Sequence, residues 1–323
     1  MEIQHLRLFL EVYRRGSFAA VARDHNVDPS SISRTIAALE RELGFSLFDR
    51  TTRRLAPTEA GEVYFHRVEP LIDDLAQAAE LAGGSAKQPQ GTLRILAPVS
   101  FSQLNIVPLL PEFMAAYPGV RLDLQLTDAL LELVENRIDV AVRLGPLDDS
   151  SYLCRKLAPM RSRICASPAY LAEHGRPELP EDLTKHACLL LDMPGFGNRW
   201  LYRSPNSGGS QTGHVDVAGR LKTSNAVTLK QLALAGAGII LQGDWIVGRE
   251  LLDGRLVDLF PDLEVTASYF DNAVWTLRPA RSHEPAKVRV FLDFLHQKFA
   301  AGAPWARPEE RSAAPGLALY PRP

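Results

Sequence analysis

Residues 17–43 read SFAAVARDHNVDPSSISRTIAALEREL, and this run contains two amphipathic patterns separated by a tight turn. Ser17 is a suitable N-cap for the first pattern, while Asp28 can cap the second and Pro29 takes its first helical position. The second pattern keeps its apolar residues on one narrow stripe, at Ile32, Ile36, Leu39 and Leu43. The run therefore predicts a helix, a turn and a second helix.

The opposite face of the second helix carries short residues and arginines, namely Ser30, Ala37, Arg34 and Arg41. Short side chains let a helix approach phosphates, and arginine reaches base edges, so this face suits a DNA major groove. An ordinary solvated face has a similar composition. Residues 47–55, LFDRTTRRL, then place three arginines in a hairpin-like loop, which favours DNA binding because such a wing lies along the backbone or in the minor groove.

Five blocks of sequence carry a family resemblance, namely residues 17–22 (SFAAVA), 28–36 (DPSSISRTI), 39–44 (LERELG), 47–50 (LFDR) and 58–61 (TEAG). Together they resemble the winged helix-turn-helix of LysR-type transcriptional regulators. The resemblance implies groove contacts from Ser30, Ser31, Ser33 and Arg34, and phosphate or minor-groove contacts from Arg50, Arg53 and Arg54. Pro57 departs from the family pattern, and we expect it to be tolerated because it precedes the candidate N-cap Thr58.

Residues 58–82 form one long helical pattern, followed by GGSAKQPQG at 83–91, which has the composition of a flexible linker. Apolar residues recur along the helix every three or four positions, at Phe65, Val68, Ile72, Leu75, Ala79 and Ala82. This stripe predicts a coiled-coil seam between two chains, although a helix packed on its own domain shows the same spacing. Pro70 predicts a bend near Arg67. The resemblance extends the pairing to a dimer of dimers.

From about residue 92 onward, apolar runs of strand length alternate with helical patterns. The candidate strands are 93–97, 120–126, 138–144, 163–166, 239–242 and 273–277, and helical stretches include 106–117 and 129–136. This alternation predicts an α/β domain with largely parallel sheets. Residues 301–323 contain five prolines and little periodicity, so we expect a disordered tail there.

This region also resembles the effector domain of the same family, a periplasmic-binding-protein-like pair of α/β lobes. The matching pieces include residues 136–145 (NRIDVAVRLG), 165–171 (CASPAYL) and 235–239 (AGAGI). The resemblance implies a small molecule held between the lobes by Val99, Ser100, Phe101, Ser102, Thr127, Leu144, Gly145, Ser167, Ser224 and Asn225. Several of these follow strands and precede helices, where anions bind well, but simple N-capping explains them too. Gln242 stands where the family often has proline.

The expected architecture is an α-helical winged helix-turn-helix domain (1–58) and an α/β two-lobe periplasmic-binding-protein-like domain (91–300). A linker and dimerisation helix with a hinge (59–90) joins them. Lobe one is expected at 91–162 and 270–300, and lobe two at 163–269. The 301–323 tail follows.

Composition limits the function further. The chain has 323 residues, 46% of them hydrophobic, and a formal charge of −2, so any DNA binding must be local. Its three cysteines form no CxxC pair and its eight histidines show no metal spacing, so we expect neither a metal nor a cofactor. The amino terminus lacks a signal-peptide pattern and no long apolar run occurs, so we expect a cytoplasmic protein that does not enter a membrane.

Other classes of function find less support. The sequence contains no GxSxG, HExxH or GxxxxGK[ST] motif, and Asp148-Asp149 is more typical of a solvated turn than of an acid–base pair, so we expect no enzyme. The amino-terminal module opposes a solute-binding transport protein. About two hundred residues of α/β domain oppose an architectural DNA binder. We therefore expect a LysR-type regulator that binds promoter DNA sequence-specifically under control of a small effector. Whether that effector is anionic or aromatic stays open.

Overall fold

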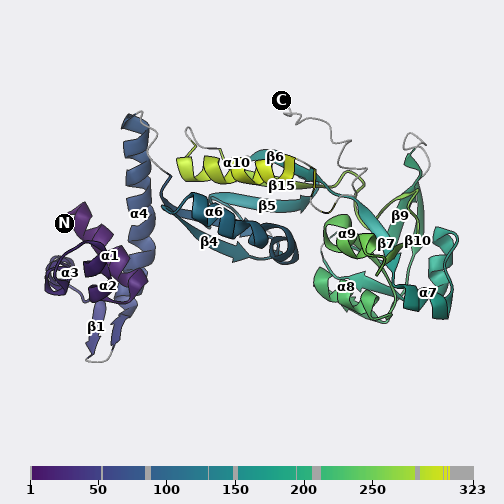
Figure 1. Ribbon diagram of the computed structural model, residues 1–323, viewed down its shortest axis with the longest axis horizontal. Helices are drawn as coiled ribbons and strands as arrows, with labels where there is room; N and C mark the ends of the chain where they lie inside the picture. The colour runs from purple at the N-terminus through teal and green to yellow at the C-terminus, as the bar shows by residue number, and fades with distance from the viewer. Residues whose placement is uncertain are drawn as a thin grey trace. The chain divides into compact units, whose positions relative to one another are not determined.

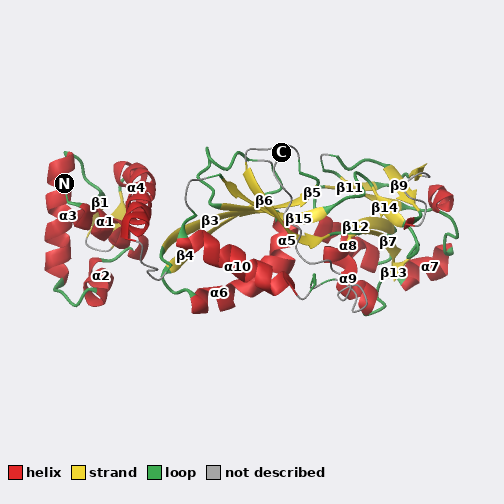
Figure 2. Cartoon of the chain, turned by 90° about the horizontal axis from the view of Figure 1, so that it is seen from above, coloured by secondary structure: helices red, strands yellow, loops and turns green. Residues whose placement is uncertain are grey.

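The computed structural model divides into two compact units, residues 1–87 and residues 88–323 (Figures 1 and 2). The residues that the structure describes are 2–51, 54–83, 89–129, 131–147, 152–193, 195–205, 212–280, 284–300, 302–303 and 305. None of the helices among them is long and apolar enough to cross a membrane.

The first unit contains the predicted helix-turn-helix. Its elements are α1 (Ile3–Arg15), α2 (Phe18–Asp24), α3 (Pro29–Leu43), β1 (Phe48–Thr51), β2 (Arg54–Pro57) and α4 (Glu59–Gly83). The Ser17 hydroxyl accepts a hydrogen bond from Ala20 N–H, and the Asp28 carboxylate accepts one from Ser30 N–H, so both predicted N-caps are confirmed. Strands β1 and β2 pair antiparallel as a hairpin.

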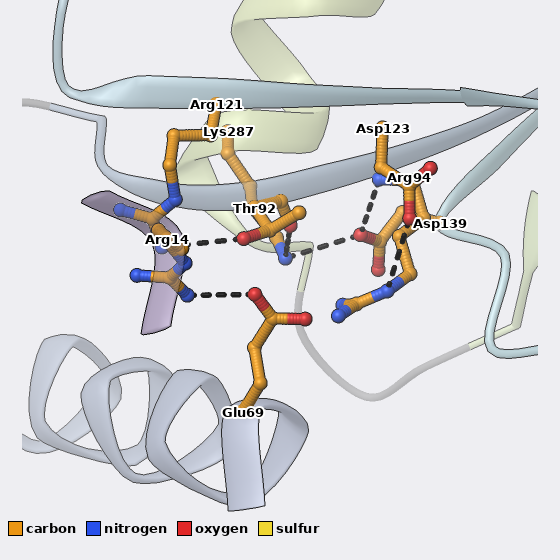
Figure 3. Close-up of polar contacts among 8 residues, drawn as sticks. All are labelled: Arg14, Glu69, Thr92, Arg94, Arg121, Asp123, Asp139 and Lys287. Carbon is orange, nitrogen blue, oxygen red and sulfur yellow. Dashed lines mark hydrogen bonds and ion pairs between the residues drawn. The ribbon is translucent and has the colours of Figure 1, made fainter. Parts of the chain in front are cut away.

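The amino-terminal half of α4 packs inside its own unit. Tyr13 of α1 stacks on Phe65 with ring centroids 3.8 Å apart, and Arg14 pairs with Glu69 at 2.6 Å (Figure 3). Three residues of the predicted seam, Phe65, Val68 and Ile72, are at most 7% exposed in this core. For these residues the coiled-coil interpretation is wrong, and the alternative of packing in the same chain holds. The helix continues through Pro70, while nothing further is described of the Ala79 and Ala82 side chains.

Lobe one is the part of the second unit built on a five-stranded sheet of order β4-β3-β5-β15-β6. Its strands are β3 (Gly91–Ala97), β4 (Val120–Leu126), β5 (Val140–Gly145), β6 (Tyr152–Pro159) and β15 (Ala273–Pro279). The helical elements are α5 (Val99–Phe101), α6 (Leu110–Ala116) and α10 (Ala286–Ala300), with a π-helical turn over Ser102–Ile106 and a 3-10 turn over Val107–Leu109. Helices α6 and α10 lie side by side on one face of the sheet, where Phe113 contacts Phe291 and Phe294 (Figure 2).

Lobe two is the part built on an eight-stranded sheet, in which the main order is β10-β9-β14-β7-β12-β8-β11 and β13 pairs with β7. The strands are β7 (Ser162–Ala166), β8 (Cys188–Leu191), β9 (Arg199–Arg203), β10 (Thr212–Asp216), β11 (Leu221–Thr223), β12 (Ile239–Gly243), β13 (Val257–Asp258) and β14 (Glu264–Thr266). The helices are α7 (Pro168–His174), α8 (Ala226–Leu234) and α9 (Asp244–Leu252), with a 3-10 turn over Pro180–Lys185. The chain passes between the lobes twice, and Met160 N–H donates to Asn272 O at 3.1 Å where the two passes meet.

Three sequence predictions for this unit need correction. Both sheets are mixed, because β15 runs antiparallel to β5 and β6, and β7 runs antiparallel to β12. Residues 129–136 do not form the expected helix, and the described part of that stretch is loop and turn. The core also extends into the expected tail: Ala303 and Trp305 are 3% and 6% exposed, because their side chains complete the apolar core of lobe one. The rest of 301–323, apart from Gly302, lies outside the described residues.

A buried ion pair joins α10 to the sheet of lobe one. Lys287 Nζ lies 3.1 Å from Asp139 Oδ2, and the two residues are 4% and 6% exposed (Figure 3). Asp139 also accepts a hydrogen bond from Arg94 N–H at 3.2 Å, and Lys287 donates to Thr92 O. The aspartate of the NRIDVAVRLG block thus connects the start of β5 to β3 and α10.

Candidate DNA interface and effector site

The exposed face of α3 carries the predicted groove residues. Ser30 and Arg34 are exposed, and Ser31 and Ser33 are partly exposed, while Ile32, Ile36 and Leu39 on the opposite side are buried. Arg34 donates from Nε to Ser30 O at 3.2 Å and from Nη2 to Ser30 Oγ at 3.3 Å. Its guanidinium therefore lies along the first turn of α3, beside the hydroxyl that the sequence predicts to face the groove.

The first turn of α3 is organised by Asp28. Hydrogen bonds from Ser30 are the main reason why the pKa of Asp28 lies below its usual value. The carboxylate is therefore ionised at neutral pH and caps the helix on which the groove residues stand.

The wing begins directly after the short connection that follows α3. In its register Arg50 lies opposite Leu55, and Thr51 lies opposite Arg54, so two of the predicted arginines stand near the end of the hairpin. Arg53 lies outside the described residues, as do the side chains of Arg50 and Arg54. Their contacts with DNA stay a prediction.

The start of α4 closes against the base of the wing. Thr58 Oγ1 donates to Ser46 O at 2.7 Å and accepts from Gly61 N–H at 2.9 Å. A Cβ on Gly61 would lie 2.0 Å from Leu47 O, so only glycine permits this approach. This contact explains why the TEAG block ends in glycine, at position 61.

In lobe one, the predicted effector residues gather where three neighbouring parallel strands end. Strand β3 pairs parallel with both β4 and β5, so their carboxyl ends lie at one edge of the sheet. Val99 N–H donates to Asp128 Oδ1 at 3.2 Å, and Thr127 N–H donates to Ala97 O at 3.0 Å. Trp275 Nε1 donates to Gly145 O at 2.9 Å. Residues 99–102, 127 and 144–145 therefore share this edge, where α/β proteins bind ligands.

Their side chains have different surroundings. Ser100 and Ser102 are 6% and 0% exposed, and within the described parts of the chain Ser102 Oγ has no hydrogen-bond partner. Phe101 is also fully buried, and its ring contacts Trp245 of lobe two at 5.5 Å between centroids. Phe101 therefore belongs to the junction between the lobes. The next residue, Ser102, has a buried hydroxyl without a hydrogen-bond partner among the described residues.

In lobe two, Ser224 and Asn225 follow β11 at the edge where the parallel strands β8, β11 and β12 end. Asn225 Oδ1 accepts from Thr228 N–H at 2.9 Å and caps α8. Gln242 near the end of β12 is 3% exposed, and its Nε2 finds no hydrogen-bond partner among the described residues. In the sequence, Gln242 stood out only as a departure from the family pattern.

Ser167 does not join this group, which corrects the sequence prediction. It caps α7 by accepting from Tyr170 N–H, and it follows β7. Because β7 runs antiparallel to β12, Ser167 lies at the opposite edge of the sheet, near Gly236. The local pattern of strand, hydroxyl and helix was right, but the direction of the strand was not visible in the sequence.

The described residues contain no group of three or more His, Cys, Asp or Glu side chains that could hold a metal ion. The arrangement as a whole is that of a winged helix-turn-helix DNA-binding protein whose second unit is a two-lobed α/β domain.

Comparisons with known proteins agree with this class. The family described as "Bacterial regulatory helix-turn-helix protein, lysR family" matches residues 3–62, and the family described as "LysR substrate binding domain" matches residues 86–300. The regulator CrgA of Neisseria meningitidis is 33% identical over 292 residues, which cover 90% of this chain and 95% of the relative. The regulator DmlR of Escherichia coli is 33% identical over 305 residues, covering 94% and 96%.

Solved structures show the same similarity. The CrgA structure from Neisseria meningitidis is 31% identical and covers 92% of this chain and 99% of its own, with a TM-score of 0.58. The full-length structure of the Vibrio cholerae virulence activator AphB is 29% identical and covers 91% and 98%, with a TM-score of 0.56. The chain belongs to the LysR family of transcriptional regulators, with a helix-turn-helix DNA-binding domain and an effector-binding domain. Regulators of this class bind promoter DNA and small effectors and form oligomers.

Proposed function

We propose that α3 reads promoter DNA in the major groove through Ser30, Ser31, Ser33 and Arg34, while Arg50, Arg53 and Arg54 of the wing contact phosphates or the minor groove. The observation that carries this proposal is the Arg34 guanidinium, which lies exposed along the first turn of a helix whose other face is buried. Short hydroxyl side chains beside it let the helix approach the DNA backbone.

The experiment is a fluorescence-anisotropy titration over a series of KCl concentrations. The probes are a duplex enriched from a random pool by the unaltered protein and a scrambled duplex of equal composition. The unaltered protein is expected to prefer the enriched duplex by about a thousandfold or more, with a steep dependence on salt. Weak and equal binding to both duplexes would contradict sequence-specific recognition and favour the architectural alternative.

The effector site that we propose lies between the lobes. Lobe one contributes Val99, Ser100, Ser102, Thr127, Leu144 and Gly145, and lobe two contributes Ser224, Asn225 and Gln242. Two buried polar groups without partners among the described residues, Ser102 Oγ and Gln242 Nε2, support a ligand with polar acceptor atoms such as a carboxylate. Ser102→Ala and Gln242→Leu are expected to abolish the response to a carboxylate metabolite while sparing DNA affinity. Full response in both variants would remove these residues from the site.

Dimerisation through α4 is proposed on a surface that keeps Leu75 of the predicted stripe and adds Leu71. Leu71 and Leu75 are 59% and 48% exposed and lie one helical turn apart, next to the buried face of the helix. A second copy of α4 would cover them, and two such dimers would form the tetramer that the family resemblance implies. Sedimentation velocity of Leu71→Lys/Leu75→Lys is expected to show a smaller species. Val63→Lys, at an exposed position on another face of α4, is the matched control and is expected to leave the assembly intact.

The protein is further proposed to act without catalysis, metal or cofactor, because members of its family work by binding DNA and effector. Its place is then the bacterial cytoplasm, where promoter DNA is found. Purified protein is expected to leave its effector chemically unchanged after prolonged incubation, as mass spectrometry of the recovered ligand would test.

A further inference from the structure

Glu40 lies on α3 and accepts two backbone hydrogen bonds from the segment that leads into the wing. Leu47 N–H donates to Glu40 Oε1 at 2.8 Å, and Phe48 N–H donates to the same oxygen at 3.2 Å. Leu47 and Phe48 are 0% and 3% exposed. Since β1 begins at Phe48, the recognition helix holds the first residue of the wing directly.

The other side of this segment is held by the start of α4. Thr58 N–H donates to Leu47 O at 3.1 Å, and Thr58 Oγ1 donates to Ser46 O at 2.7 Å. Pro57, the last residue of β2, lies opposite Phe48 in the hairpin. The base of the wing is therefore held between α3 and α4, and Glu40 accepts two hydrogen bonds on the side of α3.

We propose that Glu40 is a positioning residue for DNA recognition, whose carboxylate sets the angle between the wing and the recognition helix. The inference rests on the proposed function, in which the wing arginines contact DNA. Each wing strand has four residues, so the hairpin is about 13 Å long. A tilt of about 10° at its base would displace its tip by about 2 Å, which is more than the distance range of a hydrogen bond allows.

The direction of the change in DNA affinity distinguishes a positioning role of Glu40 from a simple effect of its negative charge. Removing a carboxylate near DNA reduces repulsion of the phosphates and by itself tightens binding. A displaced wing weakens binding and lowers the salt slope by about 0.9 for each phosphate that its arginines no longer neutralise. Glu40→Ala is therefore expected to bind about tenfold more weakly with a shallower salt slope. Glu59→Ala removes the same charge from an exposed position in the first turn of α4 and is expected to bind as tightly as the unaltered protein or more tightly.

The conservative variant supplies a second readout. Glu40→Gln keeps an acceptor oxygen at the same position and is expected to restore binding to within a few fold. Thr58→Val removes the anchor on the other side of the segment and is expected to weaken binding in the same direction. Circular dichroism melting of each variant monitors whether the first unit folds.

The deciding experiment is a double-mutant cycle measured by anisotropy on the enriched duplex, in which Glu40→Ala is combined with Arg50→Ala/Arg53→Ala/Arg54→Ala. If Glu40 acts through the wing, Glu40→Ala causes no further loss in the triple-alanine background. A triple variant that binds like the unaltered protein would refute the wing contacts themselves. A triple variant that binds weakly, but loses as much again on adding Glu40→Ala, would refute the positioning role. If Glu40→Ala does not fold, the same cycle is measured with Glu40→Gln, and the smaller loss that it causes is expected to disappear in the triple-alanine background; a loss that persists there would refute the positioning role.

A second, independent observation concerns the junction between the lobes. The Trp305 ring, 6% exposed, lies against Phe101 and Phe299 of lobe one, with ring centroids 5.7 Å away in each case. Its backbone carbonyl faces α9 of lobe two, where a Cβ on Gly248 would lie 2.6 Å from Trp305 O. Trp305 therefore contacts both lobes, as does the ring pair of Phe101 and Trp245.

From this geometry we infer that Trp305 fixes the angle between the two lobes. The contact is tight on the side of lobe two, because Gly248 leaves no room for a side chain. On the side of lobe one it presses on Phe101, which stands between Ser100 and Ser102 of the proposed effector site. Trp305 thus influences the proposed effector site through Phe101 without lining the site itself.

Hydrogen exchange of the full chain tests this inference by comparing 99–106 in lobe one with 244–252 in lobe two. Trp305→Ala is expected to raise exchange in both segments about tenfold, while β10, at the outer edge of the sheet in lobe two, keeps its protection. Trp305→Phe keeps an aromatic ring and is expected to behave like the unaltered protein. Gly248→Ala keeps the Trp305 side chain but presses a Cβ against its carbonyl oxygen, and it is expected to reproduce the effect from the other lobe. Unchanged exchange over 244–252 in both Trp305→Ala and Gly248→Ala would overturn the inference.

Discussion

Replacing Asp139 by asparagine is expected to destabilise the second unit strongly while leaving the DNA-binding unit intact. The asparagine side chain would keep the size of the aspartate but remove the charge that faces Lys287 Nζ at 3.1 Å. Because Lys287 is only 4% exposed, its ammonium would be left buried without that partner. Breaking a buried ion pair in this way costs about 3–5 kcal/mol. For a unit of this size that corresponds to a fall in Tm of roughly 6–20 °C.

Intrinsic fluorescence reports this change without a label. All four tryptophans, Trp200, Trp245, Trp275 and Trp305, belong to the second unit. Urea unfolding followed by tryptophan emission therefore measures the second unit alone, and anisotropy on the enriched duplex measures the first. Asp139→Asn is expected to lower the urea midpoint without changing the m-value.

The double variant Asp139→Asn/Lys287→Met separates the ion pair from the packing. Methionine fills the space of the lysine stem without a charge, so most of the lost stability is expected to return. A decrease of less than about 1 kcal/mol in the free energy of unfolding of Asp139→Asn would refute the reasoning, since such a value is typical of an exposed ion pair. So would a double variant that is less stable than the single one.

Three further predictions follow from single contacts. Arg34→Ala is expected to weaken binding to the enriched duplex by about 1–3 kcal/mol and to the scrambled duplex much less; equal losses in anisotropy titrations would reduce Arg34 to a phosphate contact. Gly61→Ala would press a Cβ against Leu47 O and is expected to lower the stability of the first unit by about 1–3 kcal/mol, measured by its helical circular dichroism signal, with Ala60→Gly as an exposed control. Burial, and next the charge of Arg155, lowers the pKa of His296 to about 4. Protonation then opposes folding, so the stability of the second unit is complete above about pH 6.5 and falls by at most about 3 kcal/mol as the pH drops to about 4. Urea midpoints at pH 7 and pH 5 are expected to differ less in His296→Phe than in the unaltered protein.

The parts of the fold that depend on residues close together in the sequence could be predicted. Ser17 and Asp28 cap their helices where the local pattern placed them, and β4 has the bounds that its apolar alternation predicted. The stripe on α4 shows the limit of such patterns. A spacing of three and four residues indicates that one face of a helix is buried, but it does not indicate which element covers that face. Here Phe65, Val68 and Ile72 pack in one core with α1 of the same chain.

The parts that depend on the direction of strands were not readable. Ser167 and Asn225 both cap a helix after a strand, and only the antiparallel course of β7 sends Ser167 to the far edge of the sheet.

Trp305 lies in a proline-rich stretch without periodicity, and its burial depends on packing against Phe101, Phe299 and Gly248, which no local pattern describes. Gln242 could be noticed only as an unusual residue at the end of a predicted strand.

Two hydrogen bonds to a ligand at the proposed effector site would supply enough free energy for regulation. A tenfold change in DNA affinity requires about 1.4 kcal/mol of difference in effector binding between two states of the protein. Each buried polar group that gains a partner contributes about 1–3 kcal/mol, because leaving it unsatisfied carries that penalty. Ser102 Oγ and Gln242 Nε2 stand on different lobes, so a ligand that satisfies both does so only at one angle between the lobes. One carboxylate spanning these two groups would therefore select a lobe angle with enough free energy to change DNA binding at least tenfold.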